Sequence, residues 1–86
     1  MPAAAPQTGV TGEQAILTLL GQRPAGATIC PSEAARLLAG PKGDWRAEME
    51  RVHAATDILV EQGAITLSWK GETKQKRRGP YRIARR

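Results

Sequence analysis

The chain has 86 residues, of which 41% are hydrophobic, and a formal net charge of +5. A chain of this length forms one small domain that buries only roughly two-thirds of its unfolded surface, so its stability is modest. The single cysteine, Cys30, excludes an internal disulfide and fits a reducing compartment. The start of the chain lacks the features of a secretory signal, and no stretch approaches the roughly 18 apolar residues of a membrane span. We therefore expect a cytoplasmic protein with no membrane partner.

The positive charge is concentrated near the end of the chain. Residues 1–61 contain five Lys or Arg and seven Asp or Glu, which gives a net charge of −2. Residues 62–86 contain eight Lys or Arg and one Glu, which gives +7. This asymmetry is the strongest functional signal in the sequence, and it indicates a polyanionic partner.

Residues 1–10 are rich in Ala and Pro, with Val10 as their only large aliphatic side chain. Such a segment buries too little surface to offset the entropy of ordering, which predicts a disordered tail before a domain at residues 11–86. The first helix is expected to begin at Thr11, because T-G-E-Q has the pattern of a capping box that Gln14 completes. Its predicted inward side chains are Ile16, Leu17 and Leu20.

A short extended segment is expected at residues 27–29, because Pro31 disfavours helical geometry at the residue before it. The run PSEAARLLAG then predicts a second helix, capped by either Cys30 or Ser32. Its predicted core-facing side chains are Ala34, Leu37 and Leu38.

The longest helix is predicted within residues 44–63, where apolar residues recur at spacings of three and four. Asp44 is suited to cap its start, and Gly63 is suited to the left-handed residue that follows a helix end. The predicted apolar stripe consists of Trp45, Met49, Val52, Thr56 and Leu59, widened by Ala55 and Ile58.

Two segments near the end of the chain alternate between apolar and polar residues, which predicts strands at residues 64–70 and 81–84. The intervening run GETKQKRRG is expected to be a polar loop, so the two strands form a hairpin with a long basic tip. The predicted inward side chains are Ile65, Leu67, Trp69, Tyr81 and Ile83. Together, the elements predict a mainly α, α+β winged helix, in which three helices pack on a small antiparallel sheet with a basic hairpin wing.

Several phrases of the sequence are similar to those of a known family. CPSEAARLL, WRAEM, GPYRI and the GAIT segment at residues 63–66 resemble the bacterial domain-of-unknown-function family 3253. These phrases span residues 29–83, nearly the whole expected domain. The resemblance implies a winged-helix fold, and it implies no established activity, substrate or catalytic residue.

The basic hairpin predicts contact with nucleic acid, most simply double-stranded DNA, because each Lys or Arg that neutralises a phosphate releases counterions. The long helix is a weaker candidate for reading bases, since residues 45–62 contain two positive and four negative side chains. The candidate contact residues are Lys42, Arg46, Lys70, Lys74, Lys76, Arg77, Arg78 and Arg82.

Trp45 and Trp69 are in phase with apolar stripes, so we expect them to pack in the core rather than serve as stacking platforms. The Tyr81 hydroxyl is expected at the rim of the core. Cys30 and His53 are a conceivable nucleophile and base, but a small buried cysteine is the favoured interpretation, and one Cys with one His is too few for a metal site. We expect no catalytic residue, cofactor or enzymatic activity.

An alternative function belongs to a different class. An acidic helix face beside a basic hairpin is also typical of a protein-interaction module, including one that forms a weak homodimer. A solvated basic loop that only protects a sheet edge is the simplest structural interpretation of the same charges.

Overall fold

The computed structural model describes residues 11–75 and 77–86. The expected tail at residues 1–10 and the candidate contact residue Lys76 therefore lie outside the described residues. The elements follow the order α1 (Gly12–Gly21), β1 (Thr28–Ile29), α2 (Pro31–Ala39), the 3₁₀-helix η2 (Trp45–Glu48), α3 (Met49–Glu61), β2 (Ile65–Trp69), β3 (Glu72–Lys74) and β4 (Arg82–Arg85).

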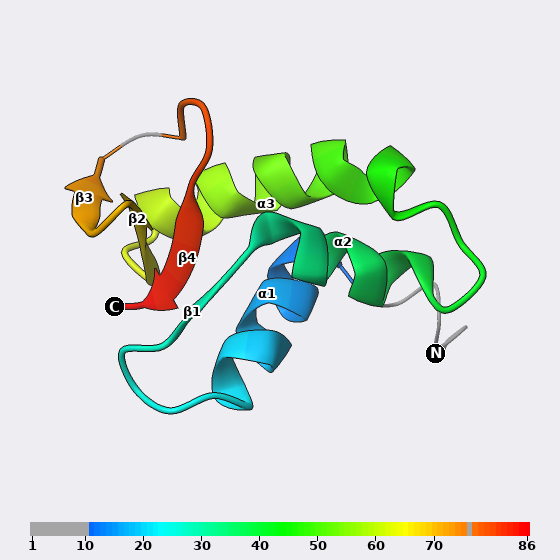
Figure 1. Ribbon diagram of the computed structural model, residues 1–86, viewed down its shortest axis with the longest axis horizontal. Helices are drawn as coiled ribbons and strands as arrows, with labels where there is room; N and C mark the ends of the chain where they lie inside the picture. Colours follow the sequence, from blue (N-terminus) through cyan, green and yellow to red (C-terminus); the bar gives the residue numbers. More distant parts are fainter. Residues whose placement is uncertain (1–10, 76) are drawn as a thin grey trace.

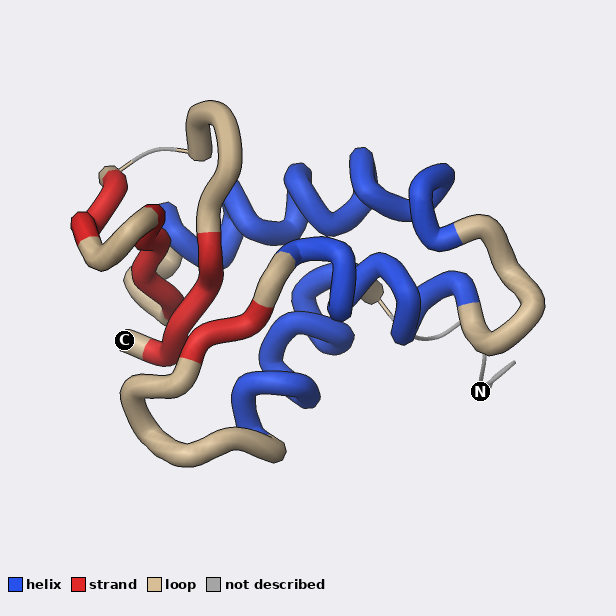
Figure 2. The backbone as a smooth tube through the Cα atoms, viewed as in Figure 1, coloured by secondary structure: helices blue, strands red, loops and turns tan. Residues whose placement is uncertain are grey.

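The four strands form one antiparallel sheet in the order β1-β4-β2-β3. Figures 1 and 2 show the strands gathered at one end of the molecule and the helices extending from them, with α3 running along the longest axis. Helix α1 packs against both α2 and α3. The predicted mainly helical α+β fold of winged-helix type is confirmed. No helix among the described residues is long and apolar enough to cross a membrane.

The local signals for the helix ends are also confirmed. Thr11 and Gln14 cap α1 reciprocally, with hydrogen bonds of 2.8 and 3.0 Å between side chain and backbone. Asp44 accepts a hydrogen bond from the backbone of Arg46 at the start of η2, and Gly63 adopts a φ of 73° after α3. The long helix differs from the prediction in its first turn, which is 3₁₀ rather than α-helical.

The polar loop predicted after β2 is partly wrong, because it contains β3. Trp69 pairs with Glu72 across a two-residue turn, Lys70-Gly71, in which both residues have positive φ. Positive φ at both positions matches the right-handed twist of two strands that turn tightly, and Gly71 adopts it without steric cost. The wing therefore consists of this tight β2–β3 hairpin and the loop 75–81 that leads back to β4.

The core lies between the three helices and one face of the sheet. Four residues expected to face inward are instead exposed: Leu17, Leu37, Ile58 and Trp69. Gly12 and Ala55 allow α1 and α3 to approach closely, so small residues form part of the contact between these helices. The buried apolar residues are Ala15, Ile16, Leu20, Ile29, Ala34, Ala35, Val52, Ala55, Leu59, Ile65, Leu67, Tyr81 and Ile83.

Candidate nucleic-acid interface

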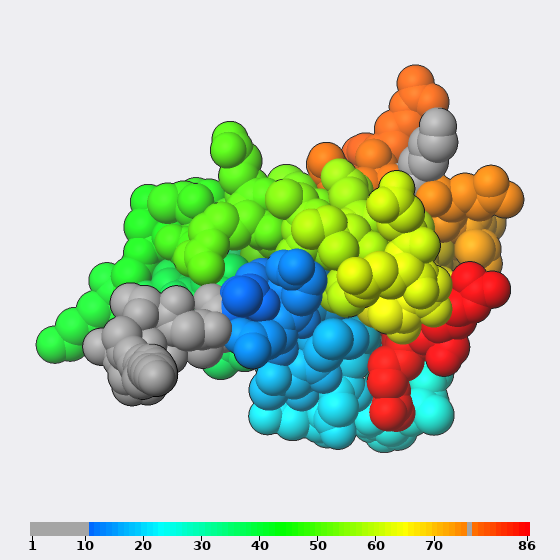
Figure 3. All heavy atoms as spheres, turned by 180° about the vertical axis from the view of Figure 1, so that it is seen from behind, coloured from blue at the N-terminus to red at the C-terminus, as the bar shows by residue number. Residues whose placement is uncertain are grey.

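The predicted contact residues fall into two groups that lie on different elements. Lys42 lies in the loop between α2 and η2, and Arg46 lies in η2, whereas the other described candidates belong to the wing or to β4. The α2–η2 loop and the wing lie toward opposite ends of a molecule that is 40 Å long, as both Figure 1 and the reverse view in Figure 3 show.

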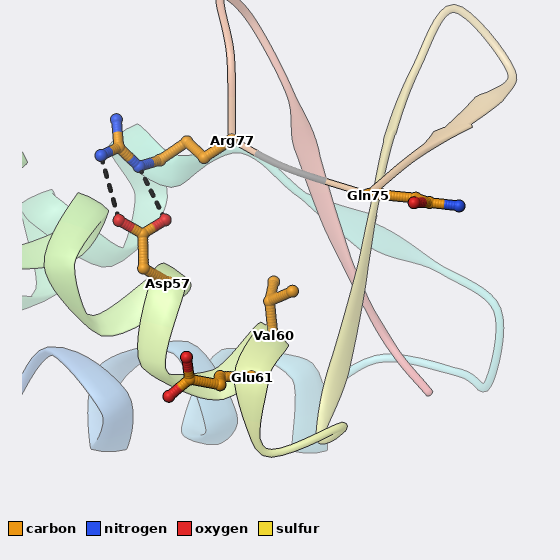
Figure 4. A pocket seen from close by; sticks show the side chains of 5 residues that line it. All are labelled: Asp57, Val60, Glu61, Gln75 and Arg77. Atoms are coloured by element: carbon orange, nitrogen blue, oxygen red, sulfur yellow. Dashed lines mark hydrogen bonds and ion pairs between the residues drawn. The ribbon is translucent and has the colours of Figure 1, made fainter.

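Arg77 folds back from the wing onto α3. Its Nε and one terminal nitrogen donate hydrogen bonds of 3.0 and 3.1 Å to the two carboxylate oxygens of Asp57 (Figure 4). The hydrogen bond to Asp57 raises the pKa of Arg77 above its ordinary value. Because the Asp57 side chain is 53% exposed, an ion pair of this kind contributes only about 0.2–1 kcal/mol. Arg77 therefore attaches the wing to the helix and is not a free cation.

Two further candidates form hydrogen bonds within the fold. The Lys74 ammonium donates to the backbone carbonyls of Arg78 and Pro80, which closes the loop before β4. The Arg82 guanidinium donates to the hydroxyl of Thr28 at 2.6 Å and to its carbonyl at 3.3 Å. Arg82 therefore joins β4 to β1 through side chains as well as through the backbone ladder.

The other two described cations of the wing, Lys70 and Arg78, are exposed to solvent. Lys70 occupies the β2–β3 turn and Arg78 occupies the following loop, and both are exposed. Of the seven described Lys and Arg residues in 62–86, only Arg77 forms an ion pair with another described residue. Arg85 and Arg86, which were not among the predicted contacts, add exposed positive charge at the end of β4. Most of the basic surplus is therefore not neutralised within the described part of the fold.

The chain matches the family model described as "Protein of unknown function (DUF3253)" over residues 10–86. It belongs to this family. The resemblance found in the sequence phrases is thereby confirmed, and no curated protein matches the chain.

This DUF3253 domain also has a groove that the sequence did not predict. The groove has a volume of about 330 Å³ and lies between the start of α2, the first turns of the long helix and the wing. We call it the tryptophan groove, since both tryptophans of the chain line it. Its main walls are Trp45, Met49, His53, Trp69, Pro80 and Tyr81.

The expectation that both tryptophans belong to the core is only half right. Trp45 is half-buried and packs against the core, and the guanidinium carbons of Arg36 and Arg46 lie 4.9 and 4.5 Å from the centre of its ring. Trp69 is 38% exposed, because it is the last residue of β2 and its neighbour across the sheet is the short strand β3. Its position directly before the Lys-Gly turn is the sequence signal that this ring lies at the sheet's edge.

Two lining residues of the tryptophan groove, His53 and Tyr81, form a chain of hydrogen bonds with the buried Thr56. His53 Nδ1 and the Tyr81 hydroxyl share a hydrogen bond of 2.7 Å, and the hydroxyl also lies 3.4 Å from that of Thr56. Burial is the main cause that raises the pKa of Tyr81 and the main cause that lowers the pKa of His53, with the charge of Arg77 lowering the latter further. The Tyr81 hydroxyl was expected at the rim, but the residue is buried and hydrogen-bonded.

The arrangement offers little for catalysis among the described residues. Cys30 lines the tryptophan groove with His53, but Cys30 accepts its hydrogen bond from the Ser32 hydroxyl at 3.1 Å and the lining contains no carboxylate. No cluster of three or more His, Cys, Asp or Glu side chains in residues 11–75 and 77–86 is arranged to hold a metal ion. The surface instead presents exposed positive charges on the wing and aromatic side chains in the tryptophan groove.

Proposed function

We propose that the protein binds nucleic acid, with double-stranded DNA as the simplest partner, through the exposed cations of the wing. The proposal rests on the positive charge that stays unpaired in the folded protein. Of the described Lys and Arg side chains in residues 62–86, Arg77 alone is paired with a carboxylate. Unpaired Lys and Arg side chains attract phosphates and release their counterions.

The cations of the wing have different roles in this proposal. Lys70 and Arg78 contact phosphates, because they are exposed and project from turns. Lys74 and Arg82 hold the wing and the sheet in shape through their hydrogen bonds. Arg77 neutralises Asp57, which lessens the repulsion between the acidic face of α3 and a phosphate backbone close to the wing.

The long helix has a minor role in the proposed contact. Its exposed face includes Glu50, Asp57 and Glu61, which repel the phosphates on either side of a DNA groove. Lys42 and Arg46 precede this face in the α2–η2 loop and in η2, so they form a second group of cations before the first turn of α3.

The test compares two variants with the same change in net charge. Lys70→Ala/Arg78→Ala removes two wing charges, and Lys42→Glu makes an equal change at the opposite end of the molecule. The variants are titrated against random-sequence duplex DNA at several salt concentrations, and the logarithm of the binding constant is plotted against the logarithm of the salt concentration. The magnitude of this slope is expected to be lower by about two for the double variant, since each phosphate contact contributes about 0.9. The Lys42→Glu variant is expected to keep most of the slope. Equal effects of the two variants, or none from the double variant, would reject the wing as the contact surface.

The alternative function, self-association of an acidic helix face with a basic hairpin, has less support. It needs charges such as Asp57 and Arg77 to pair between copies, whereas these two are joined within one chain. We therefore favour nucleic acid over a second copy of the chain as the partner.

A further inference from the structure

We propose that the tryptophan groove receives one unpaired nucleobase, while the cations around it hold the phosphates on either side. This inference rests on the proposed binding of nucleic acid and makes it more specific: the preferred ligand is a duplex with a single-stranded end rather than a fully paired duplex.

The walls of the groove suit a flat aromatic ring. Trp45, Trp69 and Tyr81 come from three different elements and line the same groove, with Pro80 beside them. Its volume of about 330 Å³ is at the lower end of the roughly 300–1,000 Å³ found for ligand sites, which fits one ring system better than a large ligand. Aromatic side chains stack on any base, because every base has a π face.

The charges around the groove select an anionic ligand. The guanidinium groups of Arg36 and Arg46 lie against Trp45, Lys70 directly follows Trp69, and Arg78 directly precedes the lining residues Gly79 and Pro80. None of the described lining residues is a carboxylate. An apolar peptide segment would gain nothing from these cations, whereas a nucleotide combines an aromatic ring with phosphates on both sides.

The lining of the groove includes a polar side chain, His53, for the edge of a base. One nitrogen of His53, Nδ1, is engaged with Tyr81, and none of the described residues hydrogen-bonds to the other, Nε2. Since the side chain is only partly buried and lines the groove, we infer that Nε2 is the atom that a base in the groove contacts. A base that stacks on the exposed ring of Trp69 then meets a hydrogen-bonding group as well as apolar surface.

Binding in this groove can be followed in the unlabelled protein by its tryptophan fluorescence. The chain has two tryptophans and both line the groove, so intrinsic fluorescence measures its occupancy directly. The probes are a blunt DNA duplex and the same duplex with a short single-stranded thymidine overhang. The overhang duplex is expected to quench tryptophan fluorescence and to bind roughly tenfold more tightly, as one stacked base contributes. A photoreactive 5-iodouracil in the overhang is expected to cross-link to a residue of the groove.

The matched variants separate stacking from general loss of surface. Trp69→Leu removes an exposed ring and is expected to weaken overhang binding roughly tenfold and blunt-duplex binding much less, because the exposed wing cations remain. Trp69→Phe, which keeps a ring, is expected to restore much of the affinity. Leu17→Ala, an equally exposed apolar position on α1 outside the groove, is expected to change neither.

The outcomes distinguish this inference from the proposed function. Salt-dependent binding of both duplexes with equal affinity, without quenching or a cross-link in the groove, would overturn the base site and leave the wing proposal standing. Binding of neither duplex would remove both. Quenching by an acidic, proline-rich peptide but not by the overhang would reassign the groove to a protein partner and refute the nucleobase.

Discussion

His53 links the tryptophan groove, the wing and the long helix through one side chain. Its imidazole forms a hydrogen bond with Tyr81, another lining residue of the groove. Three charged side chains shift its pKa: Arg77 on the wing, and Asp57 and Glu50 on its own helix. Burial and the charge of Arg77 lower its pKa below 6.5, whereas the two carboxylates oppose that shift. The fold therefore favours the neutral form of this histidine.

We expect the stability of the fold to fall as the pH drops below about 6.5, the pKa of an unfolded histidine. A proton binds the unfolded chain more readily than the folded one in this range, so acid favours unfolding until the pH passes the lower folded-state pKa. Urea unfolding at about pH 7.5 and about pH 5.5 measures the effect. The His53→Gln variant keeps a hydrogen-bonding group and is expected to show a smaller loss. Equal losses in the two proteins would assign the pH dependence to other groups.

At the scale of elements, the approach of α1 to α3 depends on a residue without a side chain. A Cβ atom at Gly12 would lie 2.7 Å from the Cβ of Ala55 and 2.9 Å from the carbonyl oxygen of Arg51. Both distances are too short for real contacts, and one neighbour is backbone, so the helices would have to move apart. Gly12 therefore permits the close contact between α1 and α3, and a pattern of hydrophobic residues along the sequence does not reveal this role.

We expect Gly12→Ala to lower the free energy of unfolding by about 1–3 kcal/mol, as overpacking does in other cores. Gly21→Ala is the matched control at the other end of the same helix, where an added Cβ meets nothing within 4 Å. This control is expected to be neutral or to stabilise the fold by up to about 1 kcal/mol. Chemical denaturation of both variants tests the pair, and a harmless Gly12→Ala would show that the helix contact is loose.

Across the whole molecule, one row of apolar side chains joins distant parts of the chain. Ile83 on β4 is paired with Ile29 on one side and Leu67 on the other, and all three are buried. Strand β4 comes last in the chain but lies inside the sheet, so the sheet is complete only when residues from both ends of the domain have met. We infer that the helices and the sheet fold together.

Ile83→Ala is accordingly expected to cost about 2–5 kcal/mol, a large part of the total stability of a small domain. Far-ultraviolet circular dichroism and tryptophan fluorescence are expected to report the same urea midpoint, because one cooperative transition moves both. Ile58→Ala is the control, since that side chain is 43% exposed and surface changes usually stay within about 0.5 kcal/mol. Separate midpoints for the two probes would instead indicate that the sheet opens independently of the helices.

The sequence alone determined the features that depend on neighbours within a few residues. The capping of α1 by Thr11, the end of α3 at Gly63, the strand alternation and the position of the basic segment are all local, and short-range sterics and hydrogen bonding decide them. From these features the winged-helix type followed, since few arrangements can bury three amphipathic helices and a hairpin in one core.

The packing of separate elements determines which cations are free and which rings are exposed. Arg77 meets Asp57 across 20 positions, Tyr81 meets His53 across 28 and Arg82 meets Thr28 across 54. Charge and periodicity along the chain do not encode such partners, because they depend on how separate elements pack. The tryptophan groove arises for the same reason: its walls are far apart in sequence, and packing alone brings them together.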